Sequence, residues 1–109
     1  MFEVEDTKIS MTERDFGIVL PIELELNSEI TSKDNFSIKI FKKINEEPII
    51  EKTYSNIIEN TINFQLTEEE SKLLEVGSYY YDIDWYQENS FLNNIIAKAK
   101  FKVSEKAGE

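Results

Sequence analysis

Apolar residues alternate with polar ones over two long stretches of this chain. The first begins at Phe16, and its apolar set is Phe16, Ile18, Leu20, Ile22, Leu24 and Leu26. In the second, Tyr79, Tyr81, Ile83 and Trp85 alternate with Tyr80, Asp82, Asp84 and Tyr86. A period of two places successive side chains on opposite faces of a β-strand. The pattern therefore predicts β-strands with one face on a core and the other in water.

Similar, shorter alternations bring the expected total to seven strands. They cover residues 2–11, 16–26, 36–41, 49–54, 61–66, 78–86 and 95–103. Pro21 interrupts the second strand, and because proline cannot donate a ladder hydrogen bond, it belongs at a sheet edge, a bulge or a change of sheet. Thr67 and Glu70 form a capping box that begins a short helical turn near 68–76, and Gly77 is placed to end it. With no βαβ alternation, this order predicts a two-sheet antiparallel sandwich.

The last two strands also predict their own register. Folding the chain about position 90 sets the inward residues Tyr79 opposite Phe101, Tyr81 opposite Ala99 and Ile83 opposite Ala97. The outward residues then match as well, with Asp82 opposite Lys98 and Tyr80 opposite Lys100. Large residues meet small ones inside and opposite charges meet outside, and such cross-strand pairs stabilise a sheet.

Composition narrows the classes of partner. The chain has 109 residues, which fits one domain over residues 1–104 with a disordered polar tail over 105–109. Its net charge of −10 makes nucleic acid and anionic membranes poor partners. The N-terminus lacks the basic and apolar parts of a signal peptide, and no apolar run approaches the roughly 20 residues of a membrane helix. We expect a soluble chain with no signal peptide.

Residues that usually carry catalysis are scarce. The chain has no histidine and no cysteine, and its 3 glycines are too few for a phosphate-binding loop. We therefore predict that it is not an enzyme and has no cofactor and no metal. Asp82 and Asp84 are the best metal or catalytic candidates, because they share one face of one strand. The favoured interpretation is that they are solvated and paired with Lys98 and its neighbours.

Aromatic residues provide the candidate binding surface. Trp85 could stack on a sugar, but it shares the inward face and is predicted to lie in the core. Tyr80 and Tyr86 share the outward face, where tyrosine favours protein interfaces. Phe91 and Leu92 lie in the loop 87–94, where they either fold back as a plug or meet a partner. The predicted interface is Tyr80, Tyr86, Phe91 and Leu92.

The C-terminal part of the chain carries an ordered set of motifs. They are Leu66-Thr67 at a strand end, Leu73 or Leu74 before Gly77, and the aromatic strand Tyr80-Tyr81-Asp82-Ile83. In this order the chain resembles the immunoglobulin-like sandwich domains of bacteriophage tail and baseplate proteins, including the N-terminal domain of baseplate upper proteins. Residues 36–41 with the return Glu51-Lys52-Thr53 are similar to that family's second sheet, and 97–103 to its closing hairpin.

This resemblance implies both a fold and a role. The fold is an all-β, two-sheet antiparallel immunoglobulin-like sandwich of about seven strands. The role is that of a virion structural module of a phage or prophage tail or baseplate, assembled in the bacterial cytoplasm, with no catalytic residues to carry over. Its partners are other tail or baseplate proteins or a second copy of itself. The alternative is a module that binds carbohydrate or a cell-surface partner through the aromatic loop end.

Overall fold

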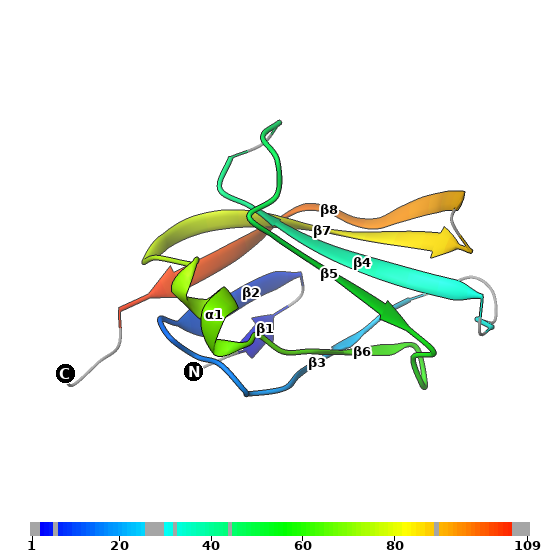
Figure 1. The fold of residues 1–109 in the computed structure, drawn as a ribbon, viewed down its shortest axis with the longest axis horizontal. Helices are drawn as coiled ribbons and strands as arrows, with labels where there is room; N and C mark the ends of the chain where they lie inside the picture. Colours follow the sequence, from blue (N-terminus) through cyan, green and yellow to red (C-terminus); the bar gives the residue numbers. More distant parts are fainter. Residues whose placement is uncertain are drawn as a thin grey trace.

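The computed structural model describes residues 3–5, 7–25, 30–31, 33–43, 45–88 and 90–105, and Figure 1 shows two β-sheets with one short helix. The strands are β1 (Glu3–Glu5), β2 (Lys8–Thr12), β3 (Leu20–Glu23), β4 (Asp34–Phe41), β5 (Ile50–Ser55), β6 (Thr61–Phe64), β7 (Gly77–Gln87) and β8 (Ser90–Ser104). The helix α1 (Glu68–Lys72) lies between β6 and β7 along the chain. The expected strand-rich fold is therefore confirmed.

The two sheets differ greatly in size. The larger one has the strand order β1-β2-β8-β7-β4-β5, and the smaller one is the pair β3-β6. Figure 1 shows the larger sheet curling over the β3-β6 pair, and buried side chains of both sheets belong to one core cluster. Neighbouring strands are antiparallel except for β2 and β8, which run parallel with Ile9 beside Phe101. The prediction of purely antiparallel sheets is wrong for this pair.

The first predicted strand forms a hairpin. β1 and β2 pair antiparallel, with Glu5 beside Lys8, so the chain reverses within residues that the alternation assigned to one strand. The other six expected strands correspond one to one to β3 through β8. The hairpin matters because its second strand, β2, is the neighbour of β8 in the larger sheet.

The second strand is much shorter than predicted. β3 covers only Leu20–Glu23, while Phe16 and Ile18 are 46% and 47% exposed. Gly17 has φ 73°, a left-handed conformation that ends an extended run, and its N–H donates to the carbonyl of Leu66 at 3.0 Å. The alternation before Leu20 therefore belongs to a loop. Leu26 and the tail beyond Glu105 lie outside the described residues.

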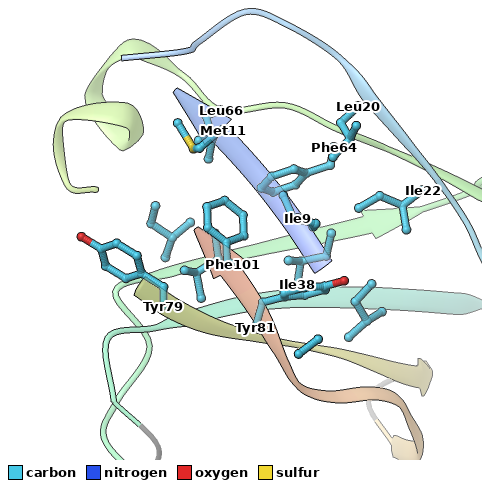
Figure 2. Close-up of a cluster of buried hydrophobic side chains, with 14 of the residues drawn as sticks. Ile9, Met11, Leu20, Ile22, Ile38, Phe64, Leu66, Tyr79, Tyr81 and Phe101 are labelled. Atoms are coloured by element: carbon cyan, nitrogen blue, oxygen red, sulfur yellow. The ribbon is translucent and has the colours of Figure 1, made fainter. Parts of the chain in front are cut away.

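The core fills the space between the sheets with aromatic and branched side chains. Figure 2 shows Phe101 of β8 beside Phe64 of the smaller sheet and Tyr81 of the larger one. Its ring meets both edge to face, with centroids 6.5 Å from Phe64 and 6.3 Å from Tyr81. All three side chains are buried, and such edge-to-face pairs are favourable beyond the area they bury. Phe101 therefore links the two sheets.

The helical turn forms with the predicted cap. Thr67 accepts from the Glu70 amide and the Glu70 carboxylate accepts from the Thr67 amide, which is a complete capping box. The turn is shorter than expected, however, because Leu73 is its C-cap and Gly77 is the first residue of β7. After the turn, Leu74 is buried, whereas Leu73 is 53% exposed.

Candidate functional site

The aromatic tip, which we define as Tyr86, Phe91 and Leu92, lies at the turn between β7 and β8. Tyr86 pairs with Phe91 across the hairpin, and their rings meet edge to face with centroids 5.7 Å apart. Phe91 is 58% exposed and Leu92 is 47% exposed, so neither folds back as a plug. The tip therefore presents apolar side chains to the outside. The end of β7 and the start of β8, which carry it, lie at one end of the larger sheet (Figure 1).

A register shift accounts for the position of Leu92. Trp85 pairs with Asn93 and Tyr86 pairs with Phe91, so β8 has one residue more than β7 between these pairs. That extra residue is Leu92. A bulge of this kind leaves one residue without a partner and bends the strand. The bulge thus places an aliphatic side chain beside the Tyr86–Phe91 pair.

Tyr80 does not belong to this surface. It pairs with Lys100 near the other end of β7, and at about 3.3 Å per residue it lies roughly 20 Å from Tyr86 along the strand. There it borders a separate hollow of about 220 Å³ together with Phe41 and Asp82. The four residues of the predicted interface are therefore split between two places on the sheet.

A lysine and an aspartate hold the tyrosine of the tip. The Lys39 ammonium donates to the Tyr86 hydroxyl at 3.3 Å and lies 3.4 Å from the Asp84 carboxylate. Burial alone would lower the pKa of Lys39, but the Tyr86 hydroxyl and the Asp84 charge outweigh it and raise that pKa. Asn94 completes the group by donating to Asp84 at 2.7 Å. The Tyr86 ring is therefore anchored at its polar end while Phe91 packs against the ring.

The two aspartates considered as metal or catalytic candidates are both engaged in the sheet. Asp84 is 8% exposed and pairs with Lys39, so the interpretation of a solvated carboxylate paired with Lys98 is wrong for it. Asp82 accepts a hydrogen bond from Lys98, but from the backbone N–H at 2.6 Å. Among the residues that the structure describes, no group of three or more histidine, cysteine, aspartate or glutamate side chains could hold a metal ion. Within that same part of the chain, no helix is long and apolar enough to cross a membrane.

Trp85 lies on the inward face, as predicted, and is held there by an aspartate that the sequence analysis did not single out. The ring stacks on Phe36 with centroids 5.9 Å apart, and the indole N–H donates to Asp34 at 2.9 Å. The N–H of Thr31 also donates to Asp34, and this hydrogen bond, together with the indole, lowers the pKa of the buried carboxyl against the effect of burial. The sequence pattern could have identified Asp34, because it lies two residues before Phe36 and alternation places both side chains on the inward face.

Taken as a surface, the tip combines exposed apolar side chains with a fixed polar base. Phe91 and Leu92 offer contact area, and the Tyr86–Lys39–Asp84 group offers hydrogen-bonding capacity beside it. Comparison with known proteins adds no function to this geometry, because no family model matches the chain and no curated protein matches its sequence.

Proposed function

We propose that this chain is a non-enzymatic assembly module that acts through protein–protein contacts, as a component of a phage or prophage tail or baseplate. The observation that carries the contact role is the exposed aromatic tip. Phe91 and Leu92 leave apolar area in water, and burying such area against a partner yields about 25 cal/mol per Å². A partner that covers the tip recovers this free energy.

The tip is also ordered before any partner arrives. Tyr86 is held by Lys39 at its hydroxyl and by Phe91 on its ring, so little side-chain freedom remains to be lost on binding. Ordering a free side chain at an interface opposes binding by about 0.5–1.5 kcal/mol. A tyrosine that is already fixed avoids most of this opposing term, which favours an interface over a chance exposure of aromatic residues.

Two features support an immunoglobulin-like sandwich as the finer description of the fold. The pair β3-β6 faces β8-β7-β4, which corresponds to strands B and E against G, F and C of such domains. In addition, Tyr79 near the start of β7 donates its hydroxyl to the carbonyl of Glu75, four residues upstream, at 2.8 Å. Immunoglobulin-like domains carry a tyrosine with this bond at the same corner.

The tail or baseplate assignment depends on the resemblance in the segment 66–83. The motifs that carry it follow the end of β6, flank α1 and continue on β7, and a tyrosine-rich strand follows a capped turn there. A tail component must dock on other virion proteins or on copies of itself. An anchored aromatic surface at the end of a rigid hairpin suits that task.

A carbohydrate-binding role is the second candidate, and the polar groups beside the rings favour it. Sugars stack on aromatic faces and require hydrogen bonds to their hydroxyls. Tyr86 and Phe91 supply the rings, and Asp84, Asn94 and Lys39 supply donors and acceptors close by. Both candidates use the same tip, so one set of variants separates them.

The test measures binding of the full chain to the tail or baseplate proteins encoded beside its gene, by calorimetry. The variant Phe91→Ser should weaken binding about tenfold or more, because a central apolar anchor is lost. Leu73→Ser is the matched control, since Leu73 is 53% exposed but lies at the end of α1. Equal affinities for both variants would contradict the proposal. Binding to a glycan array that is lost in Phe91→Ser would favour the carbohydrate role instead.

A further inference from the structure

Among the strands that the structure describes, one long segment of β8 has a neighbour on only one side. β7 pairs along nearly the whole of β8, but β2 pairs only with Phe101–Ser104. Figure 1 shows β8 continuing past the end of β2. Within the described part of the chain, no strand pairs with the outer edge of β8 from Ser90 to Lys100. An edge of this kind presents unpaired N–H and C=O groups to a further strand.

Two hollows border this edge. A groove of about 670 Å³ separates β3 from β8, and its apolar lining includes Ile22, Leu24, Tyr81, Ile95 and Ile96. A second hollow of about 450 Å³ follows the edge of β8 from Ile95 to Lys100 and shares Ile95 and Ile96 with the groove. Six residues span roughly 20 Å, which is enough for one short added strand.

The charges around the hollow differ from those of the chain as a whole. Lys8, Lys98 and Lys100 line it and are exposed, although the net charge of the chain is −10. No carboxylate of the described residues forms an ion pair with their ammonium groups. On the opposite rim, Glu23 at the end of β3 and Glu25 just beyond it line the groove. A strand bound to β8 thus has lysines beside its outward side chains.

We infer that the free edge of β8 accepts one extended strand from a partner protein, in which apolar residues alternate with carboxylates. The backbone of that strand would extend the larger sheet, its apolar side chains would enter the groove, and its carboxylates would face Lys98 and Lys100. This surface is separate from the aromatic tip, so the inference stands whether or not the tip binds a partner.

A second copy of this chain fits the edge less well. Two β8 edges laid side by side would bring the lysine rows of both copies together, and like charges on neighbouring strands are destabilising. A strand of complementary charge is therefore the expected occupant.

The experiment is an NMR titration of the isotope-labelled full chain with a synthetic peptide of about eight residues, long enough to cover the edge, in which valine alternates with glutamate. We expect saturable shifts at the amides of Ile95–Lys100 and of Ile22 and Leu24. A peptide with lysine in place of glutamate should bind about tenfold more weakly, because it meets the lysine rim. A peptide N-methylated along one edge should not bind, since it cannot extend the sheet.

Charge-reversal variants complete the test. Lys100→Glu should weaken binding of the glutamate peptide about threefold or more, whereas Lys43→Glu, which makes the same change of net charge on a loop, should not. Phe91→Ser should leave peptide binding intact. The inference is overturned if no saturable shifts occur, if both peptides bind equally, or if the shifts map to the aromatic tip. It is also overturned if sedimentation shows that the chain alone dimerises through this edge.

Discussion

The two halves of the β7–β8 hairpin follow different rules. In the proximal half, Gly77–Tyr81 pairs with Ala99–Val103 without a break, and alternate side chains enter the core. In the distal half, where Ile83–Gln87 pairs with residues between Ser90 and Ile96, the register shifts twice and Phe91 is exposed at the surface. Burial of one face specifies the register wherever a slip would expose the core side chains. Where the core ends, local backbone geometry decides the pairing instead.

The two halves also differ in what their residues do, because one maintains the fold and the other is available for binding. The proximal half holds Phe101 between the sheets, so its residues maintain the fold. The distal half holds the aromatic tip and lies beside the free edge of β8, so its residues are available to partners. Four predictions follow that test this division, given from the largest expected effect to the smallest.

The division is sharpest for two phenylalanines of one strand. Phe101→Ala should lower the free energy of unfolding by about 3–5 kcal/mol, because it empties a buried site between the sheets. Phe91→Ala should change it by no more than about 0.5 kcal/mol, because Phe91 is 58% exposed. Urea unfolding monitored by circular dichroism measures both. Similar losses for the two variants would remove the distinction between the halves.

Asp34 of β4 connects the distal half to the stability of the fold, because it accepts the indole N–H of Trp85. Asp34→Asn should cost about 1–3 kcal/mol, because one of its donors, the Thr31 amide or the Trp85 indole, then faces an NH₂ group. The lowered pKa of Asp34 stabilises the fold above the ordinary carboxyl value near 3.9, and this contribution is lost as the pH falls through the folded pKa. In acid, the free energy of unfolding should therefore depend less on pH for Asp34→Asn than for the parent protein. An unchanged acid profile would show that the carboxylate is not the stabilising group.

The buried phenol of Tyr81 makes the stability of the core depend on pH in the alkaline range. Burial raises the pKa of Tyr81 to about 12, and its hydroxyl donates to the carbonyl of Thr7. The phenol of the unfolded chain ionises near pH 10. The contribution of Tyr81 to the free energy of unfolding is therefore fully present below that pH and falls as the pH rises toward 12. Tyr81→Phe should lower the free energy of unfolding by about 1 kcal/mol at neutral pH, because the hydrogen bond is lost. It should also reduce the further decrease in stability as the pH rises from 10 toward 12. Unfolding measured between these pH values checks the slope, and parallel curves for both proteins would contradict it.

Lys98 tests whether local geometry sets the distal register. Its φ of 52° is unfavourable for a residue with a side chain, so Lys98→Gly should be neutral or stabilise by up to about 1 kcal/mol. Lys100 pairs regularly with Tyr80, and Lys100→Gly should cost about 0.5–1 kcal/mol. Thermal unfolding compares the two. Equal losses would indicate that the irregularity at Lys98 is not specified by its backbone.

Sequence patterns located most of the fold but less of the site. The pairings of Tyr79 with Phe101 and Tyr81 with Ala99 were predicted correctly, because both faces of those strands carry a clear signal. Ile83 pairs with Ile96 and not with Ala97, since a bulge absorbs residues that a simple fold-back cannot place. The site prediction failed partly for the same reason. Parity set Tyr80 and Tyr86 on one face but carried no information about the length of strand between them.

The alternation of apolar and polar residues by itself determined that this chain forms β-strands around an aromatic core, because period-two burial is a local property of the backbone. The cap at Thr67 was determined in the same way, by hydrogen bonds that close within one turn. Only the tertiary structure decided that Phe16 is exposed, that Asp84 pairs with Lys39, and that β2 leaves most of the outer edge of β8 uncovered. Each of these depends on which distant segment lies alongside, and nearest-neighbour patterns do not encode that choice.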